Sequence, residues 1–163
     1  MSAVTQLPTP AAHDGFYNGN AWSADDSIGH LLRQAMASLS RAAEAEMKLV
    51  GLTSVQWAPL MMIARGGHPT AASLARDLNT DTGAMTRMLD RLEAKGLLTR
   101  RRSETDRRVV ELALTEQGRS VTEQIPLHLG RIYNSHLGGF TPAEFEQFKG
   151  FLRRLAHNGT GPA

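Results

Sequence analysis

The side chains with the clearest chemical potential lie in one 22-residue stretch, 87–108. It contains eight basic and four acidic residues, a local charge of +4, whereas the whole chain carries +2 and the remainder therefore −2. A cationic patch on a nearly neutral protein favours a polyanionic partner, although a solvated charged face is the simpler alternative. The basic residues are Arg87, Arg91, Lys95, Arg100, Arg101, Arg102, Arg107 and Arg108.

The first half of this stretch falls on a predicted helix, 82–95, which Gly96 ends. Its apolar residues follow the i, i+3, i+4, i+7 spacing of a single buried stripe (Met85, Met88, Leu89, Leu92). The opposite face carries small residues, threonines and arginines, which suit close approach to a DNA groove and hydrogen bonds to bases or phosphates. An amphipathic surface helix without this role would show the same stripe. The predicted DNA contacts are Thr82, Gly83, Thr86, Arg87 and Arg91.

The second half predicts a β-hairpin, with strand-like runs at 97–101 and 109–114 around a polar loop at 102–106. A hairpin tip rich in arginine suits the minor groove of DNA, where the negative potential attracts guanidinium groups. Asp106 is expected to pair with a neighbouring arginine and so to fix the shape of the loop. The predicted DNA contacts here are Arg101, Arg102, Ser103, Thr105, Arg107 and Arg108.

Three shorter patterns predict the helices that position these residues. A long amphipathic helix is expected from about 25 to 50, ended by Gly51. Thr53 and Gln56 form a capping-box pattern for a second helix to about 65. Thr70 can cap a third, 71–78, and a tight turn at 79–81 then leads into the helix at 82–95. Together they are the ingredients of a helix-turn-helix, and the hairpin that follows is its wing.

Two more helices complete the predicted chain. Thr115 caps a long helix to about 137, expected to bend at Pro126. Thr141 and Pro142 open the last helix, to about 157. Residues 1–23 are interpreted as a flexible arm and residues 158–163 as a disordered tail.

Composition sets outer bounds on function. The 163 residues are 41% hydrophobic and include no cysteine, which excludes disulfides, thiolate metal ligands and thiol-based sensing. No apolar run reaches the roughly 20 residues of a membrane span and no secretory signal pattern is evident, so a cytoplasmic protein is expected. No nucleotide-binding, nucleophile-elbow or zinc-protease motif occurs and the histidines lack i, i+4 spacing, so neither an enzyme, nor a metal site, nor a cofactor is predicted.

The stretch from Leu92 to Gly118 resembles the wing signature of the MarR (multiple antibiotic resistance regulator) family. The specific part is Asp106-x-Arg108 followed by Leu112-x-Leu114-Thr115-x-x-Gly118, and the similarity extends over about 28–156. The resemblance implies a mainly α winged helix-turn-helix protein with a small β-hairpin wing. Residues 53–115 would form the DNA-binding lobe. Segments 24–52 and 116–157 would form a homodimer that binds a near-palindromic double-stranded operator.

Members of this family commonly bind small aromatic acids between the dimer helices and the DNA-binding lobe, which implies an effector site. A cation and a hydrogen-bond donor facing aromatic and thioether walls would suit a planar carboxylate, and His30, Arg33, Trp57 and Met61 offer these groups. Each has a simpler interpretation. Trp57 and Met61 fit core packing, and His30 and Arg33 fit solvent or a partner chain.

A second arrangement resembles the urate-responsive branch of the family. Trp22, Arg76, Asp77 and Arg108 would hold a purine-like anion between guanidinium groups and an indole ring. Arg76 equally fits a phosphate contact, and Asp77 a helix-surface charge. The sequence thus predicts a transcriptional repressor released from its operator by an aromatic or heteroaromatic acid. A regulator without a ligand, or a protein-interaction module built on the winged fold, is the alternative.

Overall fold

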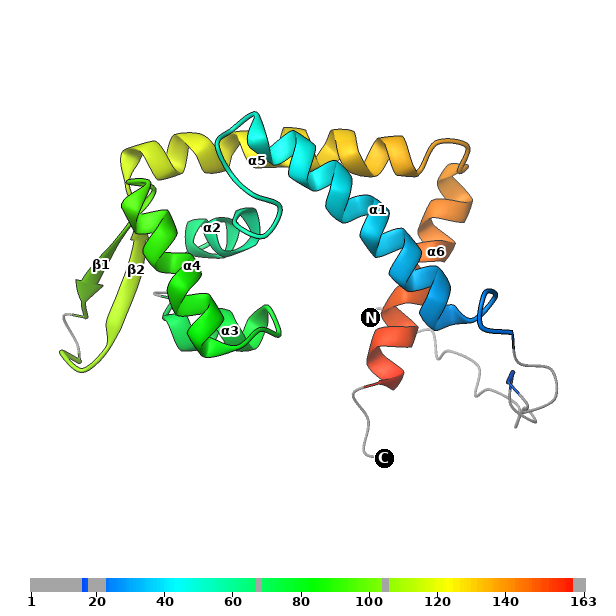
Figure 1. The fold of residues 1–163 in the computed structure, drawn as a ribbon, viewed down its shortest axis with the longest axis horizontal. Helices are drawn as coiled ribbons and strands as arrows, with labels where there is room; N and C mark the ends of the chain where they lie inside the picture. Colours follow the sequence, from blue (N-terminus) through cyan, green and yellow to red (C-terminus); the bar gives the residue numbers. More distant parts are fainter. Residues whose placement is uncertain (1–15, 18–22, 67–68, 104–105, 160–163) are drawn as a thin grey trace, which may run out of the picture. The chain divides into compact units, whose positions relative to one another are not determined.

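The predicted order of helices and strands is the observed one. A computed structural model (Figure 1) describes residues 16–17, 23–66, 69–103 and 106–159. Contacts divide the chain into two units, Met1–Ala37 and Ser38–Ala163. The elements are α1 Ile28–Lys48, α2 Trp57–Ala64, α3 Ala71–Asp77, α4 Thr82–Ala94, β1 Leu98–Arg102, β2 Val110–Leu114, α5 Glu116–His136 and α6 Pro142–Asn158.

The two strands form the predicted hairpin. β1 and β2 pair antiparallel, in a register that runs from Leu98 opposite Leu114 to Arg102 opposite Val110. The N–H of Leu112 also donates to the carbonyl of Pro69 at 3.0 Å, which ties β2 to the segment before α3. Figure 1 shows the two strands beside α4, and β1 packs on that helix. The prediction of a mainly helical winged helix-turn-helix with a small wing is confirmed.

The predicted caps begin three of the helices. Thr70, Thr115 and Thr141 each accept a backbone N–H three residues on, at the starts of α3, α5 and α6. At α6 the Glu144 carboxylate also accepts the N–H of Thr141 at 2.8 Å, and this hydrogen bond lowers the pKa of Glu144. These caps begin α3, α5 and α6 where the sequence predicts them.

The start of α2 differs from the prediction. Thr53 does not cap it, since α2 begins at Trp57 and its N-cap, Gln56, makes no side-chain cap hydrogen bond. Only half of the expected capping box exists, in which Gln56 Oε1 accepts the N–H of Thr53 at 3.1 Å. Pro59 explains the later start, because its ring would clash with the carbonyl of Val55 in a helix already formed there, whereas proline is tolerated in a first turn.

One core holds the DNA-binding lobe together. α3 packs on α4, and α2 packs on both α5 and β2. The predicted stripe of α4 faces inward, with Met85, Leu89 and Leu92 fully buried. In the described part of the chain, no helix is long and apolar enough to cross a membrane. Among the residues that the structure describes, the other buried hydrophobic core residues are Met47, Leu52, Leu60, Ile63, Leu74, Ala75, Leu97, Leu98, Leu112, Ile125 and Ile132.

Candidate nucleic-acid interface

The outer face of α4 is open to solvent as predicted. Thr82, Thr86, Arg87 and Arg91 are exposed, and Gly83 is half-buried. Asp81 caps the helix by accepting the N–H of Ala84 at 2.9 Å, which leaves the small residues of the first turn at an exposed helix end. The Thr86 hydroxyl donates to the carbonyl of Thr82 at 2.9 Å, so its remaining hydrogen-bonding capacity is as an acceptor. The face has the size and charge to enter a major groove.

The hairpin carries a second cationic surface. Arg101 and Arg102 at the end of β1, and Arg107 and Arg108 before β2, are all exposed. Ser103 is only 4% exposed, and its N–H donates to the carbonyl of Val109 at 2.9 Å. Its place is therefore inside the hairpin, and we leave it out of the proposed DNA contacts. Thr105 lies outside the described residues.

Asp106 shapes the loop through the backbone. Its Oδ1 accepts the N–H of Arg108 at 2.9 Å, and its carbonyl accepts the N–H of Val109 at 2.9 Å. The expected partner was an arginine side chain, whereas the described partner is the main chain of Arg108. Short side chains such as aspartate commonly close a turn in this way. The carboxylate thus fixes the point from which the Arg108 side chain leaves the hairpin.

Two basic residues of the patch are engaged inside the lobe. Lys95 Nζ donates to the carbonyl of Gly51 at 2.7 Å and to Gln56 Oε1 at 2.9 Å, so it ties the end of α4 to the α1–α2 connection. Arg100 Nη2 donates to Asp90 Oδ1 at 2.6 Å, and its Nη1 donates to Glu93 Oε2. These pairs join residues up to 44 apart in sequence, and the spacing of charges along the chain gives no sign of them.

Comparison with known proteins identifies the family to which this chain belongs. Residues 52–110 match the MarR family. Over 97 residues the chain is 33% identical to the multiple antibiotic resistance protein MarR of Salmonella typhimurium, an alignment that spans 60% of this chain and 67% of that protein. The chain belongs to the MarR family. It is a DNA-binding transcriptional regulator in a family of non-enzymatic proteins.

Solved structures agree with this assignment. A mutant MarR from E. coli complexed with operator DNA superposes with a TM-score of 0.73 at 27% identity, over 78% of this chain and 92% of that one. BpsR of Bordetella bronchiseptica, described for regulation of its DNA binding by 6-hydroxynicotinic acid, gives 0.75 at 26% identity, over 83% and 96%. The winged lobe and the operator-binding role are thus shared with structures of regulators.

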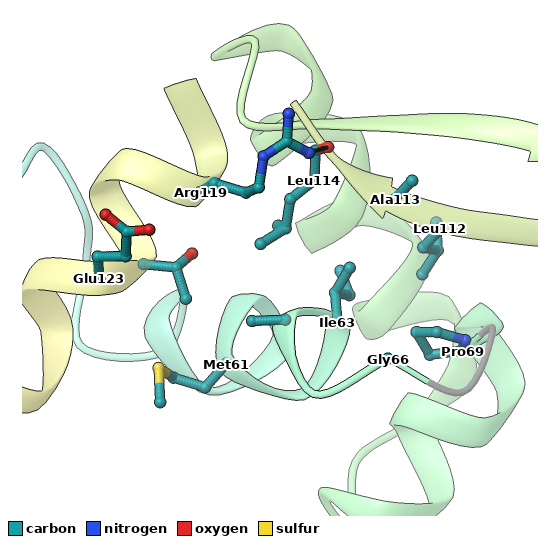
Figure 2. Close-up of a pocket in the computed structure, with 11 residues that line it drawn as sticks. Met61, Ile63, Gly66, Pro69, Leu112, Ala113, Leu114, Arg119 and Glu123 are labelled. Carbon is teal, nitrogen blue, oxygen red and sulfur yellow. Dashed lines mark hydrogen bonds between the residues drawn. The ribbon is translucent and has the colours of Figure 1, made fainter. Parts of the chain in front are cut away.

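A cavity of about 620 Å3 lies in this MarR-family chain between α2, β2 and α5. Figure 2 shows side chains of all three elements around it, with Arg119 and Glu123 both carried by α5. Arg119 Nη1 donates to the carbonyl of Leu114 at 3.0 Å. The sequence does not reveal this cavity, because nothing in the spacing of its residues brings residue 61 next to residues 112–123. The lining residues are Met61, Ile63, Ala64, Gly66, Pro69, Leu112, Ala113, Leu114, Arg119, Thr122 and Glu123.

The residues predicted for an effector belong to two different units of the chain. Met61 lines the cavity, and both Met61 and Trp57 also pack against the hydrophobic core, as their simpler interpretation has it. His30 and Arg33 belong to the N-terminal unit, where His30 Nε2 lies 2.7 Å from Gln34 Nε2 and Arg33 is exposed.

The residues of the urate-type arrangement are placed only in part. Arg76 and Asp77 form an exposed ion pair on α3, with Nε and Oδ1 3.4 Å apart, and Arg108 is exposed on the hairpin. Trp22 lies outside the described residues. The exposed pair matches the simpler interpretation of Asp77 as a helix-surface charge.

The two histidines of α5 both have protein partners. His128 is buried, and its Nδ1 lies 2.7 Å from Glu46 Oε2, a contact that joins α5 to α1. His136 contacts the Ile132 carbonyl and Ser38 Oγ. Over the described ranges, no group of three or more histidine and carboxylate side chains is arranged to hold a metal ion. We therefore assign these histidines to packing between helices.

Proposed function

We propose that this chain is a repressor that binds a near-palindromic operator as a homodimer and is released by a small aromatic or heteroaromatic acid. The observation that carries the proposal is the exposure of arginines on both α4 and the adjoining hairpin, with an apolar cavity built on the same hairpin. An effector that binds one arrangement of the lobe better than another shifts the balance between DNA-bound and free protein. The relative whose DNA binding is regulated by 6-hydroxynicotinic acid supports this class of effector.

Dimerisation would use the apolar faces that the single chain leaves open. Phe148, Phe151, Leu152 and Leu155 follow the i, i+3, i+4, i+7 spacing along α6, and each is at least 38% exposed. α6 buries none of its own residues. In the N-terminal unit, α1 likewise exposes Ile28, Leu31, Leu32 and Met36. Exposure of such apolar stripes to water is energetically unfavourable. We therefore assign segments 24–52 and 116–157 to contacts with a second copy of the chain.

Leu152→Glu tests this assignment. A buried, unpaired carboxylate in the dimer contact is expected to shift the protein from dimer toward monomer and to weaken operator binding at least tenfold, because one chain then binds one half-site. Analytical ultracentrifugation would give the mass, and fluorescence anisotropy the operator affinity.

Arg153→Glu is the matched control, since it places the same carboxylate on the opposite side of α6. It is expected to leave the mass at twice that of one chain. A Leu152→Glu protein that remains dimeric at micromolar concentration would remove α6 from the interface.

The effector is proposed to occupy the cavity between α2, β2 and α5. Its walls are mainly aliphatic, and Arg119 supplies a guanidinium group that keeps free donors beyond its hydrogen bond to Leu114. A planar ring between Met61 and the strand, with its carboxylate on Arg119, matches the lining. Pro69 and Leu112 both line the cavity, and a backbone hydrogen bond joins them. A ligand in the cavity would therefore contact the hairpin directly. The roles predicted for His30, Arg33, Trp57 and the urate-type residues stay predictions, because none of those that the structure describes lines this cavity.

Thermal melts with benzoate, salicylate, 6-hydroxynicotinate and urate test this site. A ligand present at 100 times its dissociation constant adds about 2.7 kcal/mol. That is expected to raise the melting temperature by about 5–10 °C. Arg119→Gln is expected to remove most of the shift, and the same ligand should release the wild-type protein from operator DNA.

Arg131→Gln is the control, because it removes a cation from α5 outside the cavity. A shift that survives Arg119→Gln would place the effector elsewhere. If no compound of the panel stabilises the protein, the regulator works without a ligand of this class.

A further inference from the structure

Arg100 joins the two surfaces that carry the proposed DNA contacts. It lies in the middle of β1, opposite Leu112, on the same side of the strand as the buried Leu98. Its side chain is 29% exposed and reaches α4, where it donates to the carboxylates of Asp90 and Glu93. One guanidinium group therefore links the recognition helix to the wing.

The chemistry of this link requires arginine. The two terminal nitrogens of Arg100 bond two different carboxylates, and a planar fork holds both in a fixed geometry. A lysine ammonium is a single, flexible point charge that does not reproduce the fork. The adjacent Arg101 is exposed and alternates to the other side of the strand, so only Arg100 of this pair is directed at α4.

The link is anchored on the face of α4 that carries the proposed helix contacts. Asp90 lies between Arg87 and Arg91 on the outer face of α4 and is 56% exposed. The position of the hairpin is therefore set from the same face that presents these two arginines.

We propose that Arg100 is a positioning residue that fixes the hairpin relative to α4, so that the contacts of both elements meet one duplex. Arg100 acts through Asp90 and Glu93 and does not bind phosphate. This inference rests on the proposed DNA contacts of α4 and the wing. The two neighbouring arginines of β1 then have different roles. Arg101 binds the phosphates of DNA, and Arg100 holds the hairpin in position relative to α4.

A double-mutant cycle tests the proposal. Arg100→Gln is expected to weaken binding to operator DNA about tenfold in the wild-type background and to have little effect in a protein that already carries Asp90→Asn and Glu93→Gln. Arg100→Lys is expected to behave like Arg100→Gln. Affinity for unrelated DNA, and the slope of operator affinity against salt, should stay at the wild-type values.

Arg101→Gln is the matched control on the same strand. As a phosphate contact, it should lower affinity for both DNAs and reduce the salt slope by about one for each subunit. The proposal is overturned if Arg100→Lys restores binding, if Arg100→Gln reduces the salt slope, or if its effect is the same in both backgrounds. It is also overturned if the Arg100→Gln protein binds the operator with wild-type affinity while its melting temperature shows that it is folded.

The experiment distinguishes failure of the proposed hairpin contact from failure of the positioning role. If Arg101→Gln leaves binding and salt slope unchanged, the proposed hairpin contact is wrong. If the cycle is additive while Arg101→Gln behaves as expected, only the positioning role of Arg100 is wrong.

Discussion

Gly118→Ala is expected to destabilise the protein by about 3 kcal/mol, at the upper end of the usual cost of overpacking. A Cβ at this position would lie 1.8 Å from the carbonyl oxygen of Leu97 and 2.8 Å from its carbonyl carbon. Neither backbone can retreat freely, because Leu97 accepts the N–H of Thr115 at 3.2 Å and Gly118 donates to Thr115 Oγ1 at 3.0 Å. Only glycine lets the start of α5 lie this close to the strand entry.

Thermal unfolding at a fixed protein concentration measures this effect. For a chain of this size, 3 kcal/mol corresponds to a fall of about 6–12 °C in melting temperature. Gly130→Ala is the control on the same helix, since nothing lies within 4 Å of its added Cβ and alanine is the better helix former. Its melting temperature should be unchanged or slightly higher. Equal behaviour of the two variants would mean that α5 can shift away from Leu97 at little cost.

The elements of this fold were predictable because their signals are local. The stripe of Met85, Leu89 and Leu92 is a property of one helix, and the caps at Thr70 and Thr141 depend on residues three apart. At the start of α2 a local signal misled, because a second local constraint was stronger. At α2 the fixed ring of Pro59 outweighed the capping pattern at Thr53.

What the sequence did not show are the contacts between elements. Arg100 could be counted as one more wing cation, and only the packing of β1 on α4 shows that Asp90 and Glu93 neutralise it. The cavity is of the same kind, because its Arg119 and Met61 are 58 positions apart in sequence. Charge type and spacing predict that a side chain is available for binding. Its actual partner depends on which elements the core brings together.

Among the proposed DNA contacts, Arg108 of the wing is expected to contribute most to operator affinity. The Arg108 side chain is exposed, and its backbone is held by the hydrogen bond from its N–H to Asp106 Oδ1. A side chain that leaves a fixed backbone loses less conformational freedom on binding than one on a mobile loop. In a dimer the contact occurs twice. At about 1.4 kcal/mol for each contact, removal of both is worth about a hundredfold in affinity.

Arg108→Ala is therefore expected to weaken operator binding about a hundredfold and to reduce the salt slope by about two for the dimer, with no change in melting temperature. Titrations at several salt concentrations measure both quantities. Arg65→Ala removes an exposed arginine beyond the end of α2, away from the hairpin and α4 in sequence, and should leave the slope unchanged. Wild-type affinity in the Arg108→Ala protein would mean that Arg108 does not contact the operator, because a dimer cannot lose two guanidinium groups from the minor groove without releasing fewer counterions.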